Sequence, residues 1–420
     1  MNLIKPISGR PEKIAVIVSR AIDILGGLVF LKLVSSHTSK ADMGTYLLAT
    51  SVVALLLTIS FSALSQGILR NVSKYMRDGE LPQRFSASLL AYTVITPVYA
   101  WASLSAIETL DVSKSLDQYT VILIIWITSD AIKTLNTSVA SAMRNRHLIG
   151  AATALDYTVK LGGVSYALFA EILEIDTVTK VLTIASITVA VFFLALQRRL
   201  LVKPTLRQCI ATLNDSATFA WPMVIWGAFG WAQNMSNRWI IEHFQGLDAV
   251  ATLGVLTTIG TLPVNAIFGL LTTYAQPIIY QLEEERFGAS VHFIKATLRR
   301  SLPYLGILIA STIFFHDQII ALATDQKYAD MSKYLPWITA SVIISSCGTT
   351  LSYFALARNR GATLILANTI PGITSIVISI VLIPTLSVLG AVISITITHT
   401  IWFLLLFHNF RKLTKNLTLG

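Results

Sequence analysis

Two apolar stretches decide the fold class: ATLILANTIPGITSIVISIVLI (residues 362–383) and LSVLGAVISITITHTIWFLLLF (residues 386–407). No Asp, Glu, Lys or Arg occurs between Arg360 and Arg411. A helix needs roughly 20 mostly apolar residues to cross the hydrocarbon core of a bilayer. Each stretch is that long, so the sequence predicts two consecutive membrane-spanning helices here.

The same composition extends over the whole chain. Of the 420 residues, 54% are hydrophobic and only 13% are charged, and the mean hydropathy is +0.67. Soluble domains carry about 25% charged residues, so this balance favours a membrane protein. The sequence predicts an all-α polytopic membrane protein with about twelve transmembrane helices. The predicted spans are residues 14–34, 44–66, 86–107, 118–140, 149–170, 178–197, 217–241, 250–275, 301–322, 334–356, 362–383 and 386–407.

Loop charges test this count. With the N-terminus inside, 23 Lys and Arg residues fall on the cytoplasmic side, seven fall on the opposite side, and two lie within spans. This asymmetry agrees with the positive-inside rule and predicts that both termini are cytoplasmic. The basic residues flank apolar runs rather than gathering on one face, so the net charge of +10 does not indicate nucleic-acid binding. The first apolar run lacks a cleavage site and is expected to remain as a span.

The sequence shows no sign of an enzyme active site. The predicted loops are short, and none is long enough to fold as a catalytic domain. Neither a glycine-rich phosphate loop nor a Cys/His cluster occurs, and the two cysteines are expected to be free thiols. We therefore expect a protein that is not an enzyme and has no cofactor or metal site.

An internal repeat indicates two halves. The tripeptide Arg-Asn-Arg follows the fourth span at residues 144–146 and the tenth span at residues 358–360, at an offset of 214. The predicted organisation is two parallel six-helix halves, an N-terminal lobe at 1–200 (spans 1–6) and a C-terminal lobe at 201–420 (spans 7–12). In transporters with such repeats, the substrate path lies between the halves.

Five charged residues fall at membrane depth: Asp23 in the first span, Asp130 and Lys133 in the fourth, and Asp156 and Lys160 in the fifth. Each costs roughly 2.5–3.5 kcal/mol or more in lipid, so such residues usually face a protein interior or a cavity. The fourth and fifth spans form a hairpin that turns near residue 145. Counting from that turn predicts Lys133 opposite Asp156 and Asp130 opposite Lys160.

Two interpretations of this cluster remain open from the sequence. It could be a neutral, buried clamp between two helices. It could instead be the polar wall of a cavity that binds an anionic headgroup or exchanges a proton. Asp130, Asp156 and His399, a histidine in the last span, are the candidates for ion coupling, although a lone intramembrane histidine is more often structural.

Three arginines complete the candidate binding set. Arg20 and Arg70 lie near the inner ends of the first and second spans, and Arg238 lies late in the seventh. The planar guanidinium binds phosphate in a bidentate manner. The alternative for Arg20 and Arg70 is snorkelling to the membrane interface, and for Arg238 it is a local ion pair with Glu242.

Short motifs in both halves resemble a known family. They are Asp42-Met43-Gly44-Thr45-Tyr46 at the start of the second span, Ser65-Gln66-Gly67-Ile68-Leu69-Arg70 at its end, and Ser236-Asn237-Arg238-Trp239-Ile240-Ile241 followed by Gly246. They resemble Wzx-type polysaccharide flippases of the multidrug/oligosaccharidyl-lipid/polysaccharide exporter superfamily. Asn237 stands where an acidic residue is expected in that family.

The resemblance implies a function and its partners. It implies a bacterial inner-membrane flippase that moves an undecaprenyl-pyrophosphate-linked oligosaccharide, such as an O-antigen repeat unit of lipopolysaccharide, by alternating access around a polar, often cationic cavity. The implied partners are this lipid-linked oligosaccharide, membrane lipids, a coupling proton or sodium ion, and the polysaccharide polymerase machinery.

Two alternatives stand beside this interpretation. A multidrug cation antiporter of the same superfamily would use acidic cavity residues, for which Asp23, Asp130 and Asp156 are available. An integral-membrane polysaccharide polymerase would carry a sizeable outer loop with catalytic charges, and the outer loops predicted here are all short.

Overall fold

The computed structural model describes residues 10–109, 114–143, 145–285, 288–358 and 360–415, and within these ranges every regular element is helical. The chain divides into two compact units, residues 1–228 and 229–420, which we describe separately. The division falls inside a helix. The lobe boundary that the sequence predicts, after residue 200, remains a prediction about two sets of six spans.

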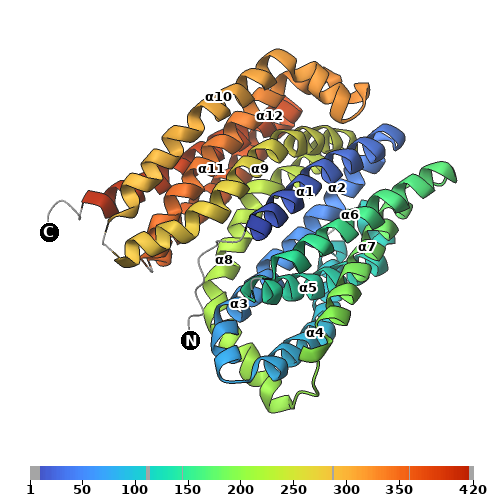
Figure 1. The fold of residues 1–420 in the computed structure, drawn as a ribbon. Helices are drawn as coiled ribbons and strands as arrows, with labels where there is room; N and C mark the ends of the chain where they lie inside the picture. Colours follow the sequence, from blue (N-terminus) through green and yellow to red (C-terminus); the bar gives the residue numbers. More distant parts are fainter. Residues whose placement is uncertain (1–9, 110–113, 144, 286–287, 359, 416–420) are drawn as a thin grey trace. The chain divides into compact units, whose positions relative to one another are not determined.

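The first unit contains the helices drawn from blue to green in Figure 1. They are α1 (Arg10–His37), α2 (Lys40–Leu56), α3 (Ala63–Arg77), α4 (Leu81–Thr109), α5 (Thr120–Ala142), α6 (Arg146–Phe169), α7 (Ile175–Leu196) and the first part of α8 (Leu206–Gln245). Short 3₁₀ turns at Lys114–Tyr119 and Arg198–Leu200 precede α5 and follow α7.

Local sequence explains where two of these helices begin. Ser39 caps α2: its hydroxyl accepts a hydrogen bond from the Asp42 amide at 3.0 Å and donates to the Asp42 carboxylate at 2.7 Å. Asn145 caps α6, since its side-chain oxygen accepts from the Leu148 amide at 3.2 Å. Side-chain oxygens at this position satisfy backbone donors that the helix itself leaves unpaired.

The second predicted span is one continuous helical segment with a wider turn in its middle. A π-helical turn at Leu57–Ser62 joins α2 to α3. The carbonyl of Phe61 within this turn accepts a hydrogen bond from the Tyr92 hydroxyl on α4 at 3.1 Å, and that hydroxyl also lies 3.1 Å from Ser65 Oγ. The turn therefore gives α4 a buried polar anchor on the second span.

Close packing joins α1 to α6, and α5 lies between α4 and α7 (Figure 1). Gly26 on α1 is buried against Tyr157 on α6, and a Cβ atom at position 26 would lie 2.5 Å from the tyrosine ring. The absence of a side chain at Gly26 is thus what allows α1 to approach α6 so closely, and this approach brings the charges of α1 beside those of α6.

The second unit contains the rest of α8 and four further elements, drawn from yellow to red in Figure 1. They are α9 (Leu247–Glu285), α10 (Ser290–Ala323), α11 (Leu335–Ala357) and α12 (Ile365–Lys415). Helix α11 packs on α9, α10 and α12. A 3₁₀ segment at Gln326–Tyr334 leads from α10 into α11.

Helix α12 is a hairpin of two antiparallel rods. Ser387 has φ 50° and ψ −129°, which breaks the helix. Contacts on either side of this break pair residues that are equally distant from it: Ser379 Oγ lies 2.8 Å from Ser394 Oγ, and the Asn409 amide donates to Thr363 Oγ1 at 3.0 Å. The chain therefore reverses at Ser387, and the eleventh and twelfth predicted spans are separate helices.

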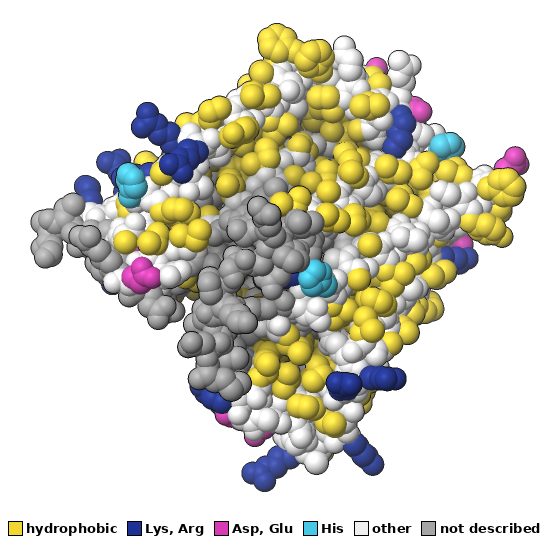
Figure 2. Space-filling view, viewed as in Figure 1, with side chains coloured by type: hydrophobic (Ala, Val, Ile, Leu, Met, Phe, Trp, Pro, Cys, Tyr) yellow, Lys and Arg dark blue, Asp and Glu magenta, His cyan; other side chains and the backbone are white. Residues whose placement is uncertain are grey.

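The predicted fold class is confirmed. Each of the twelve predicted spans lies on a helical rod with at most about three residues outside it, although some rods are longer than the span, as where α8 begins at Leu206 and the span at 217. Judged by length and composition alone, seven of the described helical segments are long and apolar enough to cross a bilayer. Figure 2 shows hydrophobic side chains over much of the visible surface, as expected for a chain that contacts lipid. Arg144 and Asn359 of the repeated tripeptide lie outside the described residues.

The lengths of several helices differ from the sequence-based expectation. The segment between the eighth and ninth predicted spans, residues 276–300, is expected to be a loop, yet most of it is helical, because α9 continues to Glu285 and α10 begins at Ser290. Polar helix-forming residues such as those of Gln281–Glu285 continue a helix beyond its apolar part. Hydropathy therefore marks the membrane-embedded part of these helices but not their ends.

Candidate substrate-binding site

The α5–α6 hairpin brings four charged side chains together inside the first unit. Lys133 Nζ on α5 lies 3.1 Å from Asp156 Oδ1 on α6, as the spacing from the turn predicts. Lys160 Nζ, one helical turn from Asp156, lies 2.6 Å from Asp156 Oδ2. One carboxylate thus binds two ammonium groups, one from each helix.

Asp130 finds different partners from those that the sequence predicts. Instead of pairing with Lys160 across the hairpin, it lies 3.6 Å from Lys133 on its own helix and accepts a hydrogen bond from Ser186 Oγ of α7 at 2.6 Å. The prediction assumed that equal distance from the turn means contact. The rotation of each helix about its axis also decides which side chains meet. Here both lysine amines donate to Asp156, so Lys160 does not pair with Asp130.

Helix α1 adds Arg20 and Asp23 to this set. Their side chains form an i,i+3 ion pair at 3.5 Å and are about half and a third exposed. Asp23 also interacts electrostatically with Asp156, Lys160 and Lys133, which places it beside the hairpin cluster. The first unit therefore gathers three cationic and three anionic groups from α1, α5 and α6, and we call these six residues the ionic cluster.

The ionic cluster is graded in exposure. The Asp156 side chain is 9% exposed, whereas those of Lys160, Asp130 and Lys133 are 20%, 23% and 27% exposed. The shared carboxylate is therefore the least exposed of the four side chains, and both lysine side chains are at least twice as exposed. Ionised groups with this much exposure are costly against lipid tails, which argues that the cluster borders a polar space.

The other sequence-predicted candidates lie apart from these contacts. Arg70 is exposed on α3. Arg238 on α8 and His399 on α12 are both buried in the second unit, where they are 9% and 4% exposed. The sequence-predicted set is thus divided between the two units, and only Arg20, Asp23, Asp130, Lys133, Asp156 and Lys160 form one cluster.

A neutral polar cluster occupies the core of the second unit, and sequence reasoning missed it. Ser379 donates to Asn237 Oδ1 and contacts Ser394, while Ser375 lies 3.5 Å from Ser236. These buried side chains come from α8 and both rods of α12. Serines four residues apart on the eleventh span, at 375 and 379, were the available signal. The second unit thus contains a buried cluster of hydroxyl and amide groups, and ionised residues such as Arg238 and Glu283 are also buried in this unit.

Buried ionic contacts outside the ionic cluster hold helix ends together. Glu283 of α9 accepts hydrogen bonds from Ser290 Oγ at 2.7 Å, the Gly288 amide at 3.2 Å and Arg358 Nε at 3.1 Å. Burial by itself raises the pKa of Glu283, but these hydrogen bonds outweigh it and hold the pKa below its ordinary value. Arg358, from the repeated tripeptide, thus joins the end of α11 to the turn between α9 and α10.

The chain shares its fold with solved transporters, among them members of the MOP superfamily. It is similar to the lipid II flippase MurJ in an inward closed conformation, with a TM-score of 0.74, 14% identity, and coverage of 97% of this chain and 90% of the other. It is also similar to an inward-facing multidrug resistance MATE family transporter of the MOP superfamily, with a TM-score of 0.71, 12% identity, and coverage of 96% and 99%.

A third similar structure is a MOP superfamily transporter from Pyrococcus furiosus, with a TM-score of 0.67, 12% identity and 97% coverage of each chain. Its description assigns it a binding pocket of reversed polarity and suggests a different function. No protein-family model matches the sequence, and no curated protein does. At these identities the likeness concerns the fold, and function has to be argued from the residues of this chain.

Proposed function

We propose that this protein is a flippase that translocates a lipid-linked oligosaccharide, carried on a polyprenyl diphosphate, from the inner to the outer leaflet of a bacterial inner membrane. The observation that carries the proposal is the graded ionic cluster of the first unit. Its buried carboxylate, Asp156, pairs with two lysines whose side chains are more exposed than the carboxylate is.

The chemistry of the cluster suits a diphosphate. Asp156 and Asp130 balance the charges of Lys133 and Lys160 while the substrate is absent, and paired charges of this kind are the ones usually found at membrane depth. A diphosphate brings negative charge and several acceptor oxygens, and charge-assisted hydrogen bonds to ammonium and guanidinium groups are strong. A diphosphate at the exposed side of the cluster can therefore replace the carboxylates as the acceptor of hydrogen bonds from the lysine amines and the Arg20 guanidinium.

The fold supports the same proposal. The structures with this fold include a lipid II flippase, whose described cargo is a lipid-linked molecule. The sequence-based resemblance to Wzx-type flippases rests on separate observations, the motifs of the second and seventh spans. We infer that the cargo is of the same chemical class, an O-antigen repeat unit or a similar oligosaccharide.

Complementation tests this function. A strain that lacks its polysaccharide flippase is given the wild-type gene, and both surface polymer and the lipid-linked precursor in the cytoplasmic leaflet are measured. We expect surface polymer to return and the precursor to fall. Variants Lys133→Gln and Lys160→Gln are expected to lower polymer at least about tenfold after correction for membrane abundance.

The chain offers a matched control. Lys180 on α7 also forms an i,i+4 ion pair, with Asp176, but its side chain is 58% exposed. Exposed pairs of this kind contribute little to stability. Lys180→Gln is expected to complement like the wild type. Equal loss in all three variants, or no complementation by the wild-type gene, would contradict the proposal.

A multidrug antiporter is the second candidate, and one observation favours it. Asp23 is the most exposed carboxylate of the ionic cluster, at 38%, and an exposed carboxylate can attract an organic cation. MATE transporters are also among the similar structures. Expression in a host without its drug pumps separates the two: resistance that requires Asp23, without restored polymer, would support the antiporter.

A further inference from the structure

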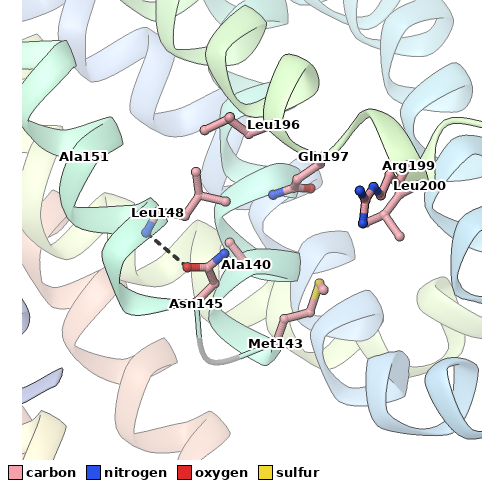
Figure 3. Close-up of a pocket in the computed structure, with 9 residues that line it drawn as sticks. All are labelled: Ala140, Met143, Asn145, Leu148, Ala151, Leu196, Gln197, Arg199 and Leu200. Atoms are coloured by element: carbon pink, nitrogen blue, oxygen red, sulfur yellow. Dashed lines mark hydrogen bonds between the residues drawn. The ribbon is translucent and has the colours of Figure 1, made fainter. Parts of the chain in front are cut away.

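A pocket opens at the end of the first unit where α5 ends, α6 begins and α7 ends (Figure 3). Its volume is about 560 Å³. Its lining is Ala140, Met143, Asn145, Leu148, Ala151, Leu196, Gln197, Arg199 and Leu200. None of these residues belongs to the ionic cluster, so the pocket is a separate feature.

The pocket contains a buried amide without a partner. Gln197 is 7% exposed, and neither its nitrogen nor its oxygen forms a hydrogen bond with any residue that the structure describes. In Figure 3 this amide faces the same space as Leu148 and Asn145. A buried amide that lacks partners is costly. It therefore indicates a ligand that supplies an acceptor or a donor at this point.

The pocket is mostly apolar and continues onto a surface typical of lipid contact. Met143 and Leu196 on its rim are 40% and 59% exposed. Ile187 and Val191, which precede Leu196 on α7 and lie on one helix face, are 40% and 58% exposed. Leu196 lies on a different face of α7 from these two residues, so the apolar rim and lining of the pocket are what suit the end of an acyl chain.

The charge at the pocket is positive. Arg199 is exposed and is the only ionisable residue in the lining that the structure describes, with no carboxylate beside it there. The loop charges predict that this end of the unit is cytoplasmic. Basic pockets between transmembrane helices on that side are suited to the headgroups of anionic lipids.

We propose that this pocket is a binding site for an anionic phospholipid of the cytoplasmic leaflet. The Arg199 guanidinium binds the phosphate, the Gln197 amide donates to an ester carbonyl, and an acyl chain lies against Leu196. A free phosphate ion would leave the apolar lining unused, whereas a phospholipid can meet the Arg199 guanidinium, the Gln197 amide and the apolar lining together. This site is independent of the proposed transport function.

Photocrosslinking on the unmodified protein tests the location. The full-length chain is reconstituted in vesicles of phosphatidylglycerol and phosphatidylethanolamine with a trace of phosphatidylglycerol that carries a diazirine on one acyl chain. We expect adducts on peptides containing Leu196 or Leu148. Adducts spread evenly over the lipid-facing helices would overturn the proposal.

Native mass spectrometry tests the residues. Gln197→Leu and Arg199→Gln are each expected to weaken retention of phosphatidylglycerol about tenfold relative to the wild type, with phosphatidylethanolamine changed less. Arg198→Gln is the matched control, because Arg198 is adjacent and exposed but does not line the pocket. We expect a change below twofold for it. Equal effects of the two arginine variants would show general interfacial attraction and overturn the proposal.

Competition distinguishes the sources of phosphate. Inorganic phosphate at millimolar concentration is expected not to displace phosphatidylglycerol, and a polyprenyl diphosphate is expected to compete no better than phosphatidylglycerol itself. Displacement by inorganic phosphate, or preferential displacement by the polyprenyl diphosphate, would overturn the assignment to a bilayer phospholipid. Ala151→Phe, at an exposed position of the lining, fills the pocket and provides a second variant that leaves the polar groups intact.

Discussion

Lys133 on α5 and Asp156 on α6 form an ion pair at 3.1 Å that joins the two helices of the hairpin, while Lys160 takes the other oxygen of the same carboxylate. Asp156 is the least exposed of these groups. We therefore propose that the two interpretations that the sequence left open, clamp and binding site, apply to different residues. Asp156 is placed to hold the helices together, and the lysines are placed to exchange partners.

If Asp156 holds the helices together and the lysines bind substrate, substitutions of Asp156 and of Lys160 should differ in their effect on stability. Asp156→Asn leaves two ammonium groups close together without their carboxylate, and removing one partner of a buried pair is strongly destabilising, by up to about 3–5 kcal/mol. We expect a fall in both membrane abundance and melting temperature. Lys160→Ala leaves Asp156 paired with Lys133 and should lower transport with a smaller loss of stability. Similar abundance of both variants would contradict this division of roles.

Gly26 offers a test of how α1 is held on α6. Gly26→Val places side-chain atoms against the Tyr157 ring, where even a Cβ would lie at 2.5 Å. Overpacking of this kind costs about 1–3 kcal/mol. The expected result is a lower melting temperature in detergent and weaker transport, because Asp23 moves away from the hairpin. Gly162→Ala on α6 meets open space and should be neutral or slightly stabilising.

Glu283 predicts a pH dependence of stability. Its pKa in the folded chain is lowered, so its contribution is fully present above the unfolded value of about 4.5. That contribution falls as pH drops through the lower folded value. We expect the melting temperature of the wild type to fall in this acidic range and that of Glu283→Gln to fall less. Glu285→Gln, exposed on the same helix, is the control, and should keep the wild-type profile.

Arg84 predicts a link between α4 and the start of α8. Its guanidinium lies 3.6 Å from Asp215 and donates to Thr212 Oγ1 at 3.3 Å, and it packs over the Tyr75 ring at 5.3 Å. Arg84→Ala is expected to cost about 1–2 kcal/mol through lost charged hydrogen bonds. The measurement is protease protection of the segment before α8. Arg77→Ala, whose side chain is 76% exposed, should leave protection unchanged.

Sequence alone predicted the elements well and their contacts in part. The twelve spans followed from apolar length, and the Lys133–Asp156 pair followed from distance along a hairpin, which is a local property. The partner of Asp130 could not be predicted from the sequence. Ser186 lies on α7, 56 residues away, and only the packing of α7 on α5 makes it a neighbour.

Other features had no signal of their own in the sequence. Gln197 sits in a run of polar and basic residues at the end of a span, where an exposed interfacial side chain is the ordinary expectation, and the fold buries it in a pocket. Glu283 and Arg358 are 75 residues apart, and neither has a partner that spacing would reveal.

The sequence by itself determined that this chain is a bundle of about twelve membrane helices and which residues place charge at membrane depth, because the bilayer imposes length and polarity on every span separately. Only the tertiary structure decided which of those charges meet, and where the Gln197 amide is buried without a partner among the residues described. These depend on how each helix is rotated and packed against neighbours distant in the chain, and close approaches such as that of Gly26 to Tyr157 set that rotation.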